Sequence, residues 1–332
     1  MSSSQENTIL FLHLMKTGGR TLASILKQNF ANDTRFHCGQ RPGETIGDLS
    51  QLSDDKRRSL RLVHGHFRFG IHHQLPHPFT YITLLRDPIE RVISHYYYAL
   101  HTPKHYTHQL VVENQMPLSA YVEHGIIDLN NGQVRAIAGD VSQSFKFGEQ
   151  NNSLLYEAQA NLDAYFSLVG ITERFDESLL LLKRQFNLTR VLYTRANVNS
   201  SRRAQTPISD DDIECIKHYN SLDIQLYERA KQQLQHQIEQ AGASFQTELK
   251  LLKELNTQYE GVQTHLNTVK HQLSKVRTVL RQARRKRNRM KTALQHQEAE
   301  YFEQLNSPSG KLWQLWDDLK QNLFISHRIN GD

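Results

Sequence analysis

The sequence predicts an α/β protein in which a P-loop-like parallel sheet is flanked by helices and followed by a long C-terminal coiled-coil helix. Two short apolar runs, residues 8–14 and 79–85, have the composition of strands buried on both faces of a parallel sheet. Amphipathic helical patterns follow them over residues 21–30 and 89–100. Apolar residues then repeat at heptad spacing over residues 252–294, which is typical of a coiled coil.

Further elements continue the alternation of strand and helix. Residues 154–165, 175–186 and 210–229 have the periodicity of amphipathic helices, and residues 191–194 have the composition of a late strand. Strands that alternate with helices indicate a mainly parallel sheet.

Changes in sequence character divide the chain of 332 residues into three segments. Residues 1–228 carry the α/β pattern, and residues 229–305 carry the coiled-coil pattern. Residues 306–332 form a short amphipathic tail whose apolar side chains are Leu312, Trp313, Leu315, Trp316, Leu319 and Leu323.

The heptad segment predicts self-association into a homo-oligomer. No proline interrupts the chain between Pro207 and Pro308. With Leu252 at position a, leucine is the main residue at a and valine at d, a pattern that favours higher-order or antiparallel assemblies over a parallel dimer. The alternative is one long solvated helix that lies on its own domain.

Several protein classes are disfavoured. No apolar run approaches the ~18 residues that span a bilayer, and the first residues lack the basic and apolar regions of a signal peptide. The two cysteines, Cys38 and Cys215, cannot form a disulfide framework. A cytoplasmic protein without a transmembrane segment is therefore expected.

Positive charge is concentrated in one segment, although the formal net charge is only +6. Residues 277–291 contain Arg277, Arg281, Arg284, Arg285, Lys286, Arg287, Arg289 and Lys291, and residues 261–297 contain no Asp or Glu. This basic segment could bind an acidic polysaccharide, an anionic membrane surface or nucleic acid. A solvated face of the coil is the alternative.

The turn after the first predicted strand is a candidate phosphate-binding loop. Its residues are Lys16, Thr17, Gly18, Gly19, Arg20 and Thr21. A glycine pair lets backbone N–H groups approach an anion, and the following helix N-terminus adds partial positive charge. A Walker A motif is excluded because Lys16 precedes the glycines. The alternative is a glycine pair that only turns the chain.

A second candidate element follows the strand predicted at residues 79–85. Arg86 stands at the end of this strand, where α/β sheets bind ligands, and Ser94 follows two helical turns later. Arginine makes charge-assisted contacts with phosphate, and serine adds a hydroxyl. The alternatives are an internal salt bridge from Arg86 to Asp87 or Glu90, and a surface hydroxyl at Ser94.

The third element is the pair His64 and His66, which flank Gly65. Imidazole titrates near neutral pH, so a histidine there could act as general base towards an acceptor hydroxyl. A metal pair is disfavoured because no third ligand stands at zinc-like spacing. An incidental pair is the remaining alternative in a chain with 18 histidines.

Together, the three segments resemble the carbohydrate sulfotransferases that include the heparan sulfate 2-O- and 6-O-sulfotransferases. Lys16–Gly19 is similar to that family's 5′-phosphosulfate loop, residues 83–98 to its 3′-phosphate element, and His64-Gly-His66 to the HGH of the 2-O enzymes. Residues 131–139, 169–178 and 220–227 add further matches. The resemblance covers about residues 8–230, so it implies that residues 1–228 form a sulfotransferase domain.

The resemblance implies transfer of a sulfuryl group from 3′-phosphoadenosine 5′-phosphosulfate (PAPS) by in-line displacement. His66 would be the catalytic base, assisted or oriented by His64, and Lys16 would neutralise charge on the leaving oxygen. Thr17, Gly18, Gly19, Arg20 and Thr21 would surround the 5′-phosphate, and Arg86 with Ser94 would bind the 3′-phosphate. Arg202 and Arg203 resemble a loop that closes over the nucleotide; the alternative is an exposed basic turn.

The expected acceptor is a hydroxyl on a glycan, a glycolipid or a small molecule, and the resemblance implies no metal. The sequence departs from the family in three ways. It lacks the membrane anchor of the Golgi members, it has Arg20 where a small or hydroxyl residue is common, and it adds the coiled coil. Two rival classes are a P-loop small-molecule kinase and a catalytically inactive nucleotide-fold head on a coiled-coil interaction protein.

Overall fold

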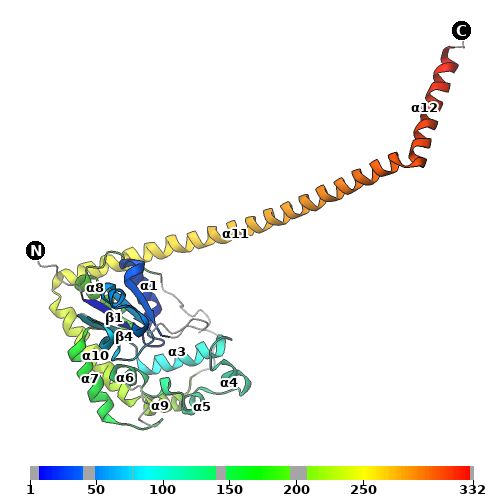
Figure 1. The fold of residues 1–332 in the computed structure, drawn as a ribbon. Coiled ribbons are helices and arrows are strands. Elements are labelled where there is room, and N and C mark those ends of the chain that lie inside the picture. Colours follow the sequence, from blue (N-terminus) through cyan, green and yellow to red (C-terminus); the bar gives the residue numbers. More distant parts are fainter. Residues whose placement is uncertain (1–6, 40–48, 77, 140–146, 195–207, 330–332) are drawn as a thin grey trace, which may run out of the picture. The chain divides into compact units, whose positions relative to one another are not determined.

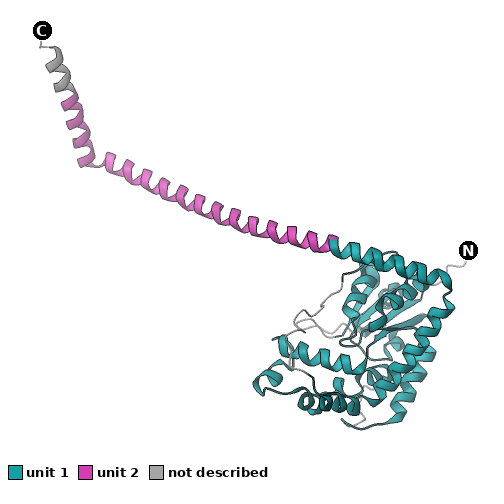
Figure 2. Cartoon of the chain, turned by 180° about the vertical axis from the view of Figure 1, so that it is seen from behind, with its two compact units in different colours: residues 1–261 teal, residues 262–332 magenta. Residues whose placement is uncertain are grey.

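The computed structural model describes residues 7–39, 49–76, 78–139, 147–194 and 208–329. The chain divides into two compact units (Figure 2). Unit 1 comprises Met1–Gly261, and unit 2 comprises Val262–Asp332. Each unit is described by itself.

Unit 1 is built on a five-stranded parallel sheet with the strand order β2-β3-β1-β4-β5 (Figure 1). The strands are β1 (Thr8–Leu12), β2 (Arg35–Cys38), β3 (Leu62–Gly65), β4 (Phe79–Leu85) and β5 (Phe166–Ile171). The strands predicted at residues 8–14 and 79–85 are confirmed as β1 and β4, although β1 ends two residues earlier, at Leu12.

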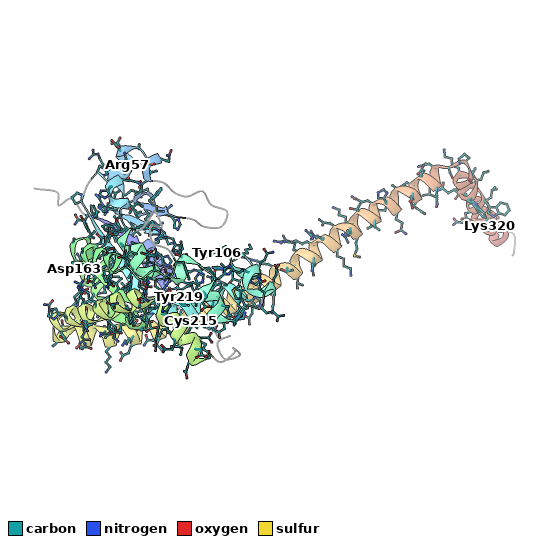
Figure 3. The ribbon with its side chains drawn as sticks, turned by 90° about the horizontal axis from the view of Figure 1, so that it is seen from below. Arg57, Tyr106, Asp163, Cys215, Tyr219 and Lys320 are labelled. Atoms are coloured by element: carbon teal, nitrogen blue, oxygen red, sulfur yellow. The ribbon has the colours of Figure 1, made fainter. Side chains whose placement is uncertain are left out.

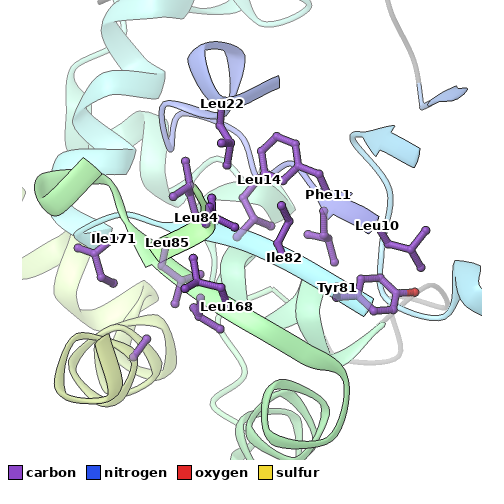
Figure 4. Packing of buried hydrophobic residues seen from close by; sticks show 14 of the residues in the cluster. Leu10, Phe11, Leu14, Leu22, Tyr81, Ile82, Leu84, Leu85, Leu168 and Ile171 are labelled. Atoms are coloured by element: carbon purple, nitrogen blue, oxygen red, sulfur yellow. The ribbon is translucent and has the colours of Figure 1, made fainter. Parts of the chain in front are cut away.

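The central strand is buried along its whole length. Every residue of β1 is buried, because helices cover both faces of the sheet (Figure 1). Leu10 and Phe11 point to opposite faces of the strand, and each has an exposed fraction of 0%. Ile82 and Leu84 of β4 join the same hydrophobic core (Figure 4).

Twelve α-helices are described. They are α1 (Gly19–Asn29), α2 (Asp54–Ser59), α3 (Pro88–His101), α4 (His108–Glu113), α5 (Leu118–Glu123), α6 (Gly132–Ala138), α7 (Asn152–Tyr165), α8 (Phe175–Phe186), α9 (Asp210–Tyr219), α10 (Ser221–Gln240), α11 (Ala243–Asn306) and α12 (Pro308–Ile329). The helices predicted over residues 21–30, 89–100, 154–165 and 175–186 are confirmed as α1, α3, α7 and α8. Pro88 stands at the start of α3, where a backbone N–H would have no hydrogen-bond acceptor within the helix.

The single helix predicted over residues 210–229 is wrong, because the chain breaks at Asn220 into α9 and α10. The buried Asn220 side chain donates to the carbonyl oxygens of Leu129 (2.8 Å) and Ile216 (3.0 Å). The first N–H groups of α10, from Leu222 and Asp223, donate to Asn131 Oδ1 at 2.9 and 3.1 Å. These bonds satisfy the groups that the break exposes.

The strand predicted at residues 191–194 is also wrong. The segment has no strand assignment, although Val191 and Tyr193 are buried. The Tyr193 N–H donates to the side-chain oxygen of Asn256 on α11 at 3.2 Å. In a sheet, a backbone carbonyl of a neighbouring strand would accept the hydrogen bond from this N–H. Here the side chain of Asn256 accepts it instead.

The core of unit 1 continues beyond residue 228, where the domain boundary was predicted. Leu234 and Ile238 of α10 and Phe245 and Leu249 of α11 belong to the same buried cluster as the sheet. Arg229 of α10 pairs with Asp163 of α7 at 2.6 Å. The first turns of the predicted coiled-coil segment therefore pack on the α/β body.

Unit 2 contains the rest of α11 and α12. Val262, Leu266, Val269 and Leu273, which belong to the predicted heptad stripe, are 39–63% exposed in the single chain. The tail helix α12 also exposes large apolar side chains, among them Trp313 (68%) and Trp316 (53%), and Lys320 lies 5.6 Å from the Trp316 ring (Figure 3). No helix in the described part of the chain is both long and apolar enough to cross a bilayer.

Candidate active site

The candidate site lies at the carboxyl edge of the sheet. Strands β1, β3 and β4 are parallel neighbours, so their carboxyl ends meet at one edge. His13–Gly18 follows β1, His66 follows β3, and Arg86 follows β4. Ligands of open α/β sheets bind at this edge, beside the central strand where the order of connections reverses.

Two left-handed residues shape the loop between β1 and α1. Lys16 has φ 65° and Gly18 has φ 75°. The buried Thr17 hydroxyl donates to the Leu14 carbonyl at 3.0 Å, which closes the turn. Gly19 has a different role, because a Cβ on this residue would lie 2.0 Å from the His13 ring. The glycine pair therefore permits both the turn and the close packing of His13.

Contacts from two other segments hold the loop in place. The Thr172 hydroxyl, in the 3₁₀ turn Thr172–Arg174 after β5, bonds the carbonyl oxygens of Thr17 (2.7 Å) and Leu85 (2.9 Å). Arg86 Nη1 donates to the Lys16 carbonyl at 3.0 Å. The loop is thus tied to the ends of β4 and β5 without a bound ligand, which is the preorganisation that an anion site requires.

The Lys16 ammonium lies over an aromatic ring. Its Nζ is 3.9 Å from the ring centroid of Tyr98 on α3. Burial, and then the nearby charges of Arg86 and Arg20, lower the pKa of Lys16 to about 8. Lys16 is therefore mostly protonated at neutral pH and can lose its charge in mildly alkaline solution.

Arg86 makes ion pairs with two glutamates. Its Nη2 lies 3.3 Å from Glu90 Oε2, and its Nε lies 3.8 Å from Glu173 Oε1. The pair with Glu90 is one of the two internal salt bridges that the sequence analysis gave as alternatives to a phosphate-binding role for Arg86. Ser94 is half-buried on α3, one turn after Glu90 and one turn before Tyr98. Since Glu90 contacts Arg86 and Tyr98 contacts Lys16, Ser94 lies on the face of α3 that is turned towards the loop.

His66 has the tautomer that a general base needs. Its Nδ1 lies 2.7 Å from the His13 carbonyl oxygen, which can only accept a hydrogen bond. Nδ1 therefore carries the proton, and Nε2 keeps its lone pair in the neutral ring. His66 is exposed, and the desolvation of its ring lowers its pKa, against the raising effects of the His13 hydrogen bond and Asp128, which favours the neutral form.

His13, which the sequence analysis did not select, supports His66. The two rings stack with their centroids 4.2 Å apart. Burial, and then the positive charge that His66 and its neighbours could carry, hold the pKa of His13 well below its usual value. A neutral His13 avoids repelling the proton that a base at His66 would accept.

His64 occupies a different position from His66. It is buried within β3, where its ring lies 5.0 Å from that of His37 on the neighbouring strand β2. Gly65 between the two histidines has φ 150°, and a Cβ there would lie 1.6 Å from the Cys38 carbonyl oxygen. The glycine therefore lets β2 approach β3 at the edge of the site.

The remaining predicted site residues are Arg20, Thr21, Arg202 and Arg203. Arg20 is exposed in the first turn of α1. The Thr21 N–H already donates to the Gly18 carbonyl at 3.0 Å, so this group is engaged within the turn. Arg202 and Arg203 lie outside the described residues. Within the described ranges, no three His, Cys, Asp or Glu side chains are grouped as a metal site would require.

The sequence analysis assigned no individual role to four residues that shape the site: His13, Tyr98, Gln133 and Thr172. The last three nevertheless lie in segments that resemble the family, residues 83–98, 131–139 and 169–178. His13 had a local signal, because it directly follows a buried strand and directly precedes the loop. The other three reach the site only through contacts between distant segments.

A parallel sheet whose central strand leads through an anion-type loop into a helix defines a nucleotide-binding α/β protein. Residues 2–287, most of the chain, match the model of the galactose-3-O-sulfotransferase family. The chain belongs to this family, and the predicted resemblance to carbohydrate sulfotransferases is confirmed.

Curated relatives support the same assignment. Heparan-sulfate 6-O-sulfotransferase 1 of Homo sapiens is 27% identical over 271 residues, and that of Gallus gallus is 26% identical over 270 residues. Heparan-sulfate 6-O-sulfotransferase 3-B of Danio rerio is 28% identical over 281 residues. Each alignment covers 68% of this chain and 63–65% of the relative, so the chain spans slightly less than two thirds of the relatives' length.

Two solved structures also match. A mouse sulfotransferase complexed with PAP is 14% identical, with 66% of this chain and 65% of that chain covered and a TM-score of 0.33. A sulfotransferase from Alicyclobacillus acidocaldarius is 12% identical, with 69% and 96% covered and a TM-score of 0.36.

Proposed function

We propose that this protein transfers the sulfuryl group of PAPS to a hydroxyl of a carbohydrate-type acceptor. One observation carries the proposal: the loop of Lys16, the base-competent His66 and Arg86 follow three adjacent parallel strands and meet at one sheet edge. Membership of a carbohydrate sulfotransferase family supports it.

His66 and Lys16 would perform the chemistry. PAPS supplies an activated sulfuryl group. As the acceptor oxygen forms its bond to sulfur, His66 Nε2 takes the hydroxyl proton. The bond from sulfur to the bridging phosphate oxygen breaks on the opposite side, and the Lys16 ammonium neutralises the charge that develops on that oxygen. The products are the sulfated acceptor and adenosine 3′,5′-bisphosphate, here abbreviated PAP.

Binding of the donor would use the two phosphate elements. The turn from Thr17 to Thr21 and the start of α1 would hold the 5′-phosphate, with Arg20 as an additional cation. Arg86 and Ser94 would bind the 3′-phosphate, which requires the Arg86 guanidinium to exchange or share its contacts with Glu90 and Glu173. His64 would orient the site from within β3.

The acceptor class follows from the relatives. The matching family model is named for galactose, and the curated relatives are named for heparan sulfate. We therefore place the acceptor hydroxyl on a glycan or glycolipid, with a small sugar-like molecule as the alternative. A cytoplasmic location, which the sequence predicts because two cysteines are too few for a disulfide framework, is part of this proposal.

Calorimetric titration tests the donor site. We expect PAP to bind tightly and 5′-AMP and ATP to bind weakly, because Arg86 and Ser94 would recognise the 3′-phosphate. Transfer of labelled sulfate from PAPS to a panel of glycans, glycolipids and small sugars would then identify the acceptor. Preference for ATP would indicate a kinase, and binding of none of the three would indicate an inactive head.

A second proposal concerns the helical part of the chain. We propose that the exposed heptad stripe of α11 forms a coiled coil with other copies of the chain, since a stripe of Val and Leu is stabilised by burial. Sedimentation velocity tests this proposal: a monomer at micromolar concentration would contradict it.

Apart from Arg287, which stands at an a position, the cations of the basic segment 277–291 would then face solvent and bind an anionic polymer or membrane surface. Retention on heparin and on anionic vesicles, compared with a variant in which Arg281, Arg284 and Arg285 are Gln, tests this binding.

A further inference from the structure

Gln133 on α6 holds the backbone at the end of β4. Its side-chain Nε2 donates to the Arg86 carbonyl at 3.0 Å, and its Oε1 accepts from the Arg86 N–H at 3.0 Å. The carboxamide thus occupies both backbone hydrogen-bonding groups of Arg86, as a neighbouring strand would do. Gln133 itself is only 1% exposed, so protein atoms fix its position on every side.

A buried polar cluster anchors Gln133. The Gln133 N–H donates to Asp223 Oδ2 at 3.1 Å, and the Val134 N–H donates to Asp223 Oδ1 at 2.8 Å. Asp223 has no exposed side-chain surface and is paired with Arg91 of α3 at 3.3 Å. The start of α6 is therefore fixed between α3 and α10, and the side chain of Gln133 extends from this fixed point to Arg86.

Gln133 holds Arg86, the residue that links the two candidate phosphate-binding segments, the loop after β1 and helix α3. Arg86 donates through Nη1 to the carbonyl of Lys16 in the loop and pairs through Nη2 with Glu90 on α3. A shift of the Arg86 backbone would move the guanidinium away from both contacts. The buried amide of Gln133 limits such a shift, because each displaced hydrogen bond would leave polar groups unpaired in a place with little water.

We infer that Gln133 is a positioning residue that sets selectivity for the 3′-phosphate through Arg86, without itself touching the donor. The inference rests on the proposed function. It predicts a specific effect: replacement of Gln133 weakens recognition of the 3′-phosphate and leaves recognition of the 5′-phosphate nearly unchanged. Small displacements of a positioned charged group reduce binding or rate by roughly 10- to 100-fold.

The test compares PAP and 5′-AMP binding by calorimetry in a double-mutant cycle. The variants are Gln133→Met, which keeps the length of the side chain and removes both hydrogen bonds, Arg86→Ala, and the double variant. We expect Gln133→Met to lower the preference for PAP over 5′-AMP about 10-fold in the wild-type background and to have almost no further effect in the Arg86→Ala background. Gln133→Asn, which keeps the amide but shortens its reach, should have the same direction of effect and serves if the Met variant does not fold.

Asn161→Leu is the matched structural control. Asn161 donates from α7 to the Ile137 carbonyl at the other end of α6 at 3.0 Å, so its loss disturbs the same helix without touching Arg86. We expect this variant to melt at a lower temperature and to keep the wild-type preference for PAP.

The outcomes separate this inference from the function it rests on. A wild-type protein that does not distinguish PAP from 5′-AMP would overturn both. Wild-type selectivity that survives the Gln133 substitutions would overturn the inference alone. An equal loss of affinity for the two nucleotides, or a loss of selectivity of the same size in the Arg86→Ala background, would also overturn it.

Discussion

Two stretches of α11 contain similar apolar side chains in different surroundings. Phe245 and Leu249 are buried against the α/β body, with exposed fractions of 0% and 7%. Further along the helix, Leu266 and Leu273 are 39% and 48% exposed. Heptad spacing therefore identifies an apolar face without identifying what covers it. The body covers the first part, and we propose that other copies of the chain cover the second.

The proposed chemistry is likewise assigned to the body. Lys16, His66 and Arg86 all belong to unit 1 and are held by contacts within it. The cationic residues of 277–291 belong to unit 2 and no acidic residue accompanies them. Substitutions in the two units should consequently affect different measurements, which is how the comparison can be tested.

The largest expected difference is in stability. Phe245→Ala should reduce the free energy of unfolding of unit 1 by about 3–5 kcal/mol, because it removes a fully buried aromatic ring. Leu273→Ala in unit 2 should change that free energy by less than about 0.5 kcal/mol. Urea unfolding followed by circular dichroism and by loss of PAP binding measures both. Equal effects of the two substitutions would contradict the division between a self-sufficient body and an exposed helix.

The next effect is on the reaction rate. Lys16→Ala should lower kcat by about 10²–10³-fold at saturating PAPS, since it removes the cation beside the leaving oxygen. Arg284→Ala, which removes a cation from unit 2, should leave kcat unchanged within about twofold. Initial rates of sulfate transfer test the pair. Full activity of Lys16→Ala would exclude its assigned role, and a large loss in Arg284→Ala would connect unit 2 to the chemistry.

The smallest predicted effect is on the pH profile. The base requires neutral His66, so kcat/KM should fall as the pH decreases through the His66 pKa, which desolvation places below its usual value. The cation requires protonated Lys16, so kcat/KM should also fall as the pH rises through about 8. Arginine does not titrate in this range, and Lys16→Arg should therefore remove the alkaline decline. An alkaline decline that persists in Lys16→Arg would assign it to another group.

Two of the five described strands and the loop could be predicted because their signals are local, whereas the short strands β2, β3 and β5 were not given bounds. β1 and β4 are continuous apolar runs, and a glycine pair followed by an amphipathic helix announces the turn into α1. The pair His64 and His66 was visible for the same reason.

The errors and omissions arise from contacts between distant residues. The break at Asn220 depends on the carbonyl of Leu129 and the side chain of Asn131, about 90 residues away. Residues 191–194 have the composition of a strand, but the N–H of Tyr193 bonds Asn256 on a helix. The role of Gln133 depends on Arg86, 47 residues earlier in the chain. The periodicity of a single segment contains no information about contacts with residues in distant segments.

The tail helix α12 gives the protein a built-in optical probe. The chain has two tryptophans, Trp313 and Trp316, and both lie on this helix, with more than half of each side chain exposed. Tryptophan emission therefore reports the surroundings of α12. A shift of emission to shorter wavelength with rising protein concentration would show that α12 becomes covered as the chains associate. Emission that stays constant while the chains associate would show that assembly leaves α12 in water.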